Sequence, residues 1–185
     1  MNYKHIQLPL SKADARSLRA GDACLLTGPV YTLRDAGHIR LLEEIRANKM
    51  KTLPYGLAGQ VIFYAGPTPP KAGRPFGAIG PTTSSRMDFA APVLMSMGLT
   101  GTIGKGERSE AVKEACVEYS SVYFVATGGA AAFLAKCVVS DETLAYDDLG
   151  TEALRRIEVV DLPVFVGIDT LGTSIYSLGD EECDG

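Results

Sequence analysis

The sequence predicts a three-layer α/β domain with a mixed sheet. Strand patterns alternate with helix patterns early in the chain and with turns in its last third. The chain has 185 residues, of which 46% are hydrophobic, and this is enough for one core. We therefore expect a single domain over residues 1–185.

Composition argues against several classes of function. A net charge of −4, without a basic stripe and without Trp, argues against a nucleic-acid-binding surface. No stretch reaches the roughly 18 uninterrupted apolar residues of a membrane span, and the N-terminal stretch lacks a long apolar core. We therefore expect a cytoplasmic protein that binds neither nucleic acid nor membrane.

The cysteines predict no metal site within this chain. They lie far apart, without a C-x-x-C pair, at Cys24, Cys116, Cys137 and Cys183. Buried thiols in a reducing compartment account for the first three.

The first third of the chain predicts strands and one amphipathic helix. Residues 8–18 indicate an edge strand and a short helical turn, and two extended runs, 23–27 and 30–33, are separated by a break at Gly28-Pro29. From residue 35 the period changes to that of a helix, with one face formed by Ile39, Leu42 and Ile45. A buried strand follows at 61–64.

The remaining elements follow from the same patterns. A helix is expected between Asp88 and Gly98, on Val93, Leu94 and Met97, and a short strand at 100–103. Ser109 is expected to cap a helix with one face formed by Val112, Ala115, Cys116 and Tyr119. Later segments predict a strand at 122–127, an alanine-rich helix at 130–136, and then a strand and a turn before a short helix at 151–157. The last two predicted strands are 163–169 and 173–178, joined by a turn.

The stretch 66–87 is the first candidate binding site. It is a Pro/Gly-rich loop that ends in four hydroxyls followed by Arg86: Thr82, Thr83, Ser84 and Ser85. Arginine grips a carboxylate or phosphate with two bonds, while hydroxyls and loop amides fill the remaining lone pairs. This composition favours an anion site, and the alternative is an ordinary solvated loop that caps the next helix.

Two further charged segments accompany this loop. Lys105 lies between two glycines, where a ligand can approach it closely, but the spacing and Gly106 do not satisfy a phosphate-loop motif. Arg34, Asp35 and His38 lie at a strand-to-helix junction, which indicates either a helix start with a salt bridge or a functional cluster. For His38 we favour helix capping.

Six segments together resemble the β subunit, or C-terminal domain, of class I fumarases and L-tartrate dehydratases, which are iron–sulfur hydro-lyases. They cover nearly the whole chain in the family's order, and GPTTS-x-RMD with the following GKG is specific to it. The segments are YTLRDAGH at 31–38, FYAGP at 63–67, GPTTSSRMD at 80–88, IGKGERS at 103–109, YFVATGGAAAFLAK at 123–136 and DLGTEALRRIEVVDLPVFV at 148–166.

The resemblance implies a swivelling β/β/α fold and a separate α subunit whose cysteines hold a 4Fe–4S cluster with one open iron, which would polarise the leaving hydroxyl. It implies a dimer of αβ units and a dicarboxylate substrate, malate and fumarate or else tartrate. By resemblance Arg34, Thr82, Thr83, Arg86 and Lys105 bind substrate, and Thr82, Arg86 and Lys105 take part in catalysis. The position of Thr82 is the one proposed as the base.

The chemistry fits these residue types. Dehydration of malate removes a weakly acidic proton beside one carboxylate, so negative charge grows on that carboxylate, and cations from several loops stabilise it. We expect the face that carries Arg34, Thr82, Arg86 and Lys105 to be concave and largely exposed in this chain alone, with a mobile loop at 66–80. Fumarase is favoured over tartrate dehydratase because it is the more widespread activity. A non-catalytic scaffold subunit or a stand-alone phosphate-binding module are the alternatives from other classes.

Overall fold

The computed structural model describes residues 2–69, 73 and 77–178 and contains a mixed seven-stranded sheet. The strand order is β1-β2-β3-β4-β5-β7-β6. β1 to β5 pair in parallel, and β7 is antiparallel to β2, β5 and β6. The strands are β1 Lys4–Gln7, β2 Ala23–Thr32, β3 Val61–Phe63, β4 Gly101–Gly104, β5 Val122–Val125, β6 Val138–Ala145 and β7 Leu154–Ile168.

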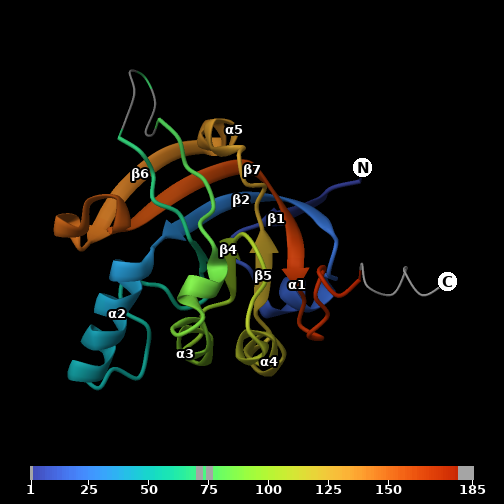
Figure 1. The fold of residues 1–185 in the computed structure, drawn as a ribbon, viewed down its shortest axis with the longest axis horizontal. Coiled ribbons are helices and arrows are strands. Elements are labelled where there is room, and N and C mark those ends of the chain that lie inside the picture. Colours follow the sequence, from blue (N-terminus) through green and yellow to red (C-terminus); the bar gives the residue numbers. More distant parts are fainter. Residues whose placement is uncertain (1, 70–72, 74–76, 179–185) are drawn as a thin grey trace.

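Helices connect the parallel strands, and Figure 1 shows α2, α3 and α4 gathered on one side of the sheet. The α-helices are α1 Lys12–Ser17, α2 Asp35–Ala47, α3 Ala91–Ser96, α4 Glu110–Tyr119 and α5 Ala131–Leu134. The 3₁₀-helices are η1 Ser84–Met87, η2 Ala135–Cys137 and η3 Asp147–Glu152. The predicted α/β class with a mixed sheet is confirmed, whereas the swivelling three-layer arrangement and the single domain stay predictions.

An additional pairing between β2 and β7 closes β2, β3, β4, β5 and β7 into a ring of hydrogen-bonded strands. One core lies against these strands and includes Leu26, Phe63, Ile103 and Phe124, all fully buried. Complete burial of a Leu, Ile or Phe side chain contributes about 1.5–3 kcal/mol. The ring therefore gives the carboxyl ends of the parallel strands a rigid base.

A second core lies between the sheet and the helices, and it corrects the predicted face of α2. Leu41, Leu42 and Ile45 are buried against Tyr31, Ile62 and Tyr64, whereas Ile39 is half-exposed. Positions 38, 41, 42 and 45 follow the spacing of one helix face, so His38 takes the inward position that the sequence pattern gave to Ile39. Val93 of α3 is likewise exposed, because Leu94 and Met95 face inward.

The predicted break at Gly28-Pro29 is wrong, because β2 runs continuously through it. Its register against β7 shifts between Leu26 and Gly28, so a bulge absorbs the irregularity within the strand. Gly28 has φ 126°, and a Cβ there would lie 2.7 Å from the Leu8 carbonyl oxygen. Residues 8 and 10 are buried beyond β1, which lies earlier than the predicted edge strand.

The last third also differs from the prediction. Residues 151–157 do not form a helix, because η3 ends at Glu152 and β7 begins at Leu154. β7 is 15 residues long and includes most of the predicted strand 163–169, while 173–178 forms turns with one bridge between Ile168 and Ser174. β6 is the strand that was predicted, without bounds, before residue 151. Pairing of residues 154–157 with β2 and β6 overrides the local helix signal here.

In the described part of the chain, no helix has the length and apolar character needed to cross a membrane. Cys24 and Cys116 are buried as predicted, whereas Cys137 is only half-buried, and Cys183 lies outside the described residues. Part of the 66–80 loop, for which mobility was predicted, also lies outside them.

Candidate active site

Two predicted site residues follow the carboxyl ends of parallel strands, Arg34 after β2 and Lys105 after β4. The loop that contains Gly66 follows β3, and Gly128 follows β5. A Cβ on Gly128 would lie 3.7 Å from Lys105 Cδ, so the ends of β4 and β5 meet. In parallel sheets with helical connections, this edge is where ligands bind.

The hydroxyl segment crosses this edge between the ends of β3 and β4. Thr82 N donates to the Tyr64 carbonyl at 2.8 Å, Lys105 N donates to the Thr82 carbonyl at 3.3 Å and Ser84 N donates to the Lys105 carbonyl at 2.9 Å. Thr83 and Lys105 form a parallel bridge, and both residues are exposed. Backbone bonds therefore place the Thr82 and Lys105 segments side by side.

Arg86 extends from η1 towards the first turn of α2. Its Nε donates to Asp35 Oδ1 at 2.9 Å, and its Nη1 donates to Thr82 Oγ1 at 3.4 Å. Half of the side chain, 50%, is exposed. Because Asp35 engages only Nε, N–H donors on the outer nitrogens of the guanidinium remain available to bind an anion.

Arg34 lies at the N-cap position of α2, beside Asp35 and Glu152. Its Nε is 3.8 Å from Asp35 Oδ2 and its Nη2 is 3.9 Å from Glu152 Oε1, while Glu152 Oε2 accepts from Ala36 N at 2.8 Å. A Cβ on Gly66 would lie 3.0 Å from both Cδ and Nη1 of Arg34. A side chain at Gly66 would therefore push against the guanidinium, which packs directly on the loop backbone.

The structure thus brings Arg34, Thr82, Arg86 and Lys105 together through a continuous series of contacts at one sheet edge. Their roles in binding and catalysis stay predictions. Ser84 is separate from them, because it is buried and accepts a hydrogen bond from Tyr123 OH at 2.9 Å.

Sequence reasoning missed a buried ion pair beneath the site. The Arg108 side chain is fully buried, and its Nε donates to Asp88 Oδ1 at 2.6 Å. The other oxygen of Asp88 accepts from Ser109 N at 2.6 Å, so Asp88 caps α4 where a Ser109 side-chain cap was predicted. Both charged residues stand in the quoted motifs GPTTSSRMD and IGKGERS, which is the signal that could have found them.

Aromatic rings enclose the Arg108 guanidinium. Its Cζ lies 5.2 Å from the Tyr64 ring centroid and 4.9 Å from that of Tyr123, and Nη1 donates to Thr102 Oγ1 at 3.2 Å. Burial lowers the pKa of Arg108, but Tyr64 and Asp88 raise it above its ordinary value, so the guanidinium stays charged. The Arg108–Asp88 ion pair therefore links the segment that contains Arg86 to the segment that contains Lys105.

The described residues do not fit an iron–sulfur cluster. Among them, no group of three or more His, Cys, Asp or Glu side chains could hold a metal ion. Burial raises the pKa of Cys24 to about 11 and that of Cys116 to about 12, which disfavours the thiolate form that binds iron.

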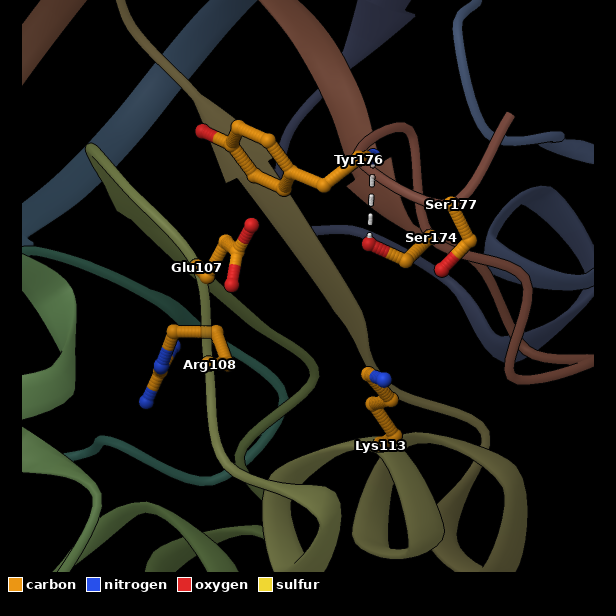
Figure 2. Close-up of a pocket in the computed structure, with 6 residues that line it drawn as sticks. All are labelled: Glu107, Arg108, Lys113, Ser174, Tyr176 and Ser177. Carbon is orange, nitrogen blue, oxygen red and sulfur yellow. Dashed lines mark hydrogen bonds between the residues drawn. The ribbon is translucent and has the colours of Figure 1, made fainter. Parts of the chain in front are cut away.

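A polar cavity of about 160 Å³ lies beside α4. Figure 2 shows its lining, in which Lys113 of α4 and Glu107 lie near the turn that carries Tyr176. Lys113 pairs with Glu110 at 3.1 Å. Arg108 lines this cavity, but its guanidinium is already paired with Asp88. The cavity is not lined by the four predicted site residues Arg34, Thr82, Arg86 and Lys105.

Comparisons with known proteins agree on one family. The family model described as Fumarase C-terminus matches residues 2–179. The chain is 40% identical over 153 residues to "Fumarate hydratase class I, anaerobic" of Escherichia coli K12. The aligned region covers 82% of this chain and 28% of that protein. The chain thus spans under a third of the length of the fumarate hydratases it matches.

Two relatives have a length similar to that of this chain. One is the "Putative L(+)-tartrate dehydratase subunit beta" of Methanocaldococcus jannaschii, 35% identical over 173 residues, with 90% of this chain and 88% of that protein covered. The other is the "L(+)-tartrate dehydratase subunit beta" of Escherichia coli K12, which is 33% identical over 179 residues. That alignment covers 94% of this chain and 87% of the relative. The chain belongs to the Fumarase C-terminus family, whose named relatives are hydro-lyases.

Proposed function

We propose that this chain is the β subunit of a two-subunit iron–sulfur hydro-lyase that interconverts (S)-malate and fumarate. The observation that carries the proposal is that three cations, Arg34, Arg86 and Lys105, lie with Thr82 at a single sheet edge. The 40% identity to a fumarate hydratase favours this substrate pair.

The residues would act on a dicarboxylate as follows. Arg34 and Arg86 bind its carboxylates, and Arg86 keeps its outer donors available because Asp35 holds Nε. Negative charge grows on the carboxylate beside the carbon that loses its proton, and the Lys105 ammonium stabilises that charge.

Thr82 is the proposed base, which removes the proton from that carbon. A threonine hydroxyl is a weak base at neutral pH, so its ionised form must be stabilised. The Arg86 Nη1 at 3.4 Å from Thr82 Oγ1 supplies a positive charge that favours the alkoxide. Thr83, exposed beside Lys105, is proposed to contact the substrate.

We further propose that an α subunit carries the 4Fe–4S cluster, that two αβ units form a dimer in the cytoplasm, and that the chain is a single swivelling β/β/α domain. The resemblance of the motifs supports these proposals. A partner chain would also bury Arg86 and Lys105, and removal of water strengthens their interaction with an anion.

L(+)-tartrate dehydration to oxaloacetate is the second candidate function. The chain covers 88% and 87% of two proteins named as β subunits of that enzyme, whereas it covers 28% of the fumarate hydratase. Tartrate differs from malate by one hydroxyl. A non-catalytic scaffold role is disfavoured, because the three predicted cations and Thr82 lie at one sheet edge.

The test is anaerobic co-expression with the α subunit encoded in the same genome, followed by assays with malate and with tartrate. Turnover of malate with the higher kcat/KM supports the proposal, and a preference for tartrate supports the second candidate. A complex that dehydrates neither substrate would reject both.

A further inference from the structure

We infer that His38 is a positioning residue, which holds the substrate-binding Arg34 in place from beneath the site. The inference rests on the proposed function and deepens it. His38 takes no part in binding substrate itself, because its side chain is fully buried under the first turn of α2.

The contact between the two residues is direct. His38 Nδ1 lies 2.8 Å from the Arg34 carbonyl oxygen, and the backbone His38 N–H donates to the same oxygen at 2.8 Å. A carbonyl only accepts, so Nδ1 carries the proton. Both lone pairs of the Arg34 carbonyl are therefore occupied by one residue, which fixes the orientation of the peptide group at the start of the helix.

Arg34 depends on this backbone contact because its side chain is loosely held. The nearest carboxylate oxygens lie 3.8 and 3.9 Å from its nitrogens, beyond hydrogen-bond distance. Within the described residues, its buried Nε has no hydrogen-bond partner. The guanidinium position is then set by the backbone at Arg34 and by the packing of Gly66 against it.

The surroundings of His38 suit a positioning role and exclude proton transfer. The ring meets Tyr64 edge-on, with centroids 5.3 Å apart, and its buried Nε2 has no partner among the described residues. Two charged groups act on the pKa of His38, Asp35 by raising it and Arg108 by lowering it. Burial lowers the pKa of His38 to about 4, so the ring is neutral near pH 7 and keeps its proton on Nδ1.

The same helix supplies a model for a matched substitution. Asn48 Nδ2 donates to the Glu44 carbonyl at 2.9 Å, which is the same four-residue spacing as His38 to Arg34. His38→Asn therefore keeps a donor for the Arg34 carbonyl. His38→Leu fills the buried space without a donor, and it leaves no new polar group unpaired because Nε2 had no partner among the described residues.

The experiment compares steady-state kinetics of the αβ complex with wild-type, His38→Leu and His38→Asn chains. A misplaced binding group costs on the order of 10- to 100-fold in kcat/KM. We expect that loss for His38→Leu, mainly as a higher KM, and recovery to within about threefold for His38→Asn. Wild-type kinetics for His38→Leu would overturn the inference, and so would equal losses for the two variants.

A second readout separates this inference from the proposed function. If the wild-type complex turns over neither malate nor tartrate, the proposed function fails, and the Arg34 Nε–H signal in ¹⁵N NMR of the full chain then decides the inference. A shifted, more mobile signal in His38→Leu that returns in His38→Asn supports it. A signal that is the same in all three chains overturns it.

Discussion

Asp35 Oδ1 accepts a hydrogen bond from Arg86 Nε at 2.9 Å. The two residues are 51 positions apart in the sequence, and the other oxygen of Asp35 lies 3.8 Å from Arg34 Nε. One carboxylate in the first turn of α2 therefore holds two arginines near each other and offsets part of their mutual repulsion. The proposed site depends on this spacing because both arginines must reach one small dicarboxylate.

Asp35→Ala is expected to lower kcat/KM of the complex by about tenfold or more, because Arg86 loses the bond that orients it. The fold should remain, since Asp35 is a partly exposed residue. Steady-state kinetics measure the effect. Asp148→Ala is the matched control, because Asp148 is exposed and accepts from Arg40 at 2.6 Å, and neither residue is a predicted site residue. Equal kinetics for the two variants would contradict the orienting role.

Arg86→Lys is expected to cost on the order of 2–4 kcal/mol in transition-state stabilisation, because lysine cannot reproduce a two-bond grip on a carboxylate. Fold and partner binding should persist, since half of the side chain faces solvent in this chain. The comparison is kcat/KM of the mutant complex with that of an Arg40→Lys complex. If kcat/KM for malate and for tartrate stayed near wild-type values, Arg86 would instead stabilise η1 or contribute to the subunit interface.

Asp88→Ala is expected to reduce the free energy of unfolding by about 3–5 kcal/mol, because it leaves the fully buried Arg108 without its partner. Glu110→Ala provides the control, since the Glu110–Lys113 pair lies on the surface and is worth about 1 kcal/mol or less. Urea denaturation of the isolated chain measures both. A loss for Asp88→Ala no larger than that for Glu110→Ala would show that this ion pair does not hold the loops together.

The stability of the chain should depend on pH through His38. Its pKa falls from 6.5 to about 4 on folding, so the unfolded chain binds more protons between these values. The contribution of neutral His38 to the free energy of unfolding is then fully present above pH 6.5, and it is lost as pH falls towards 4. Relative to His38→Leu, the wild-type chain should lose about 2 kcal/mol between pH 7 and pH 5. Parallel pH curves for the two chains would contradict the buried, neutral state.

Local patterns predicted the elements whose signals are local. The helix with Val112, Ala115 and Cys116 and the strand at 122–125 appear as expected, since their apolar residues recur with the period of the element. Only the second half of β7 was predicted from local pattern, because its full length of 15 residues is stabilised by pairing with β2, β5 and β6. The inward position of His38 was missed because a histidine gives no apolar signal.

The sequence indicated which residues to group as a candidate site, but not how they contact one another. The resemblance of the motifs pointed to Arg34, Thr82, Arg86 and Lys105, while the hydroxyls and Arg86 at the end of a glycine-rich loop favoured an anion site by themselves. The bond between Asp35 and Arg86 depends on how α2 and η1 pack at the sheet edge, which no local pattern encodes. The Arg108–Asp88 pair likewise exists only once β3, β4 and the loops beyond them are assembled.

The most direct test is malate dehydration by three anaerobic preparations: this chain alone, the α subunit alone and the two together. We expect the isolated chain to be folded, colourless and inactive, and fumarate to form at a high rate only in the reconstituted complex. A brown preparation of this chain alone with 4Fe–4S absorbance and malate turnover would contradict a shared active site. So would an α subunit whose kcat/KM is unchanged when this chain is added.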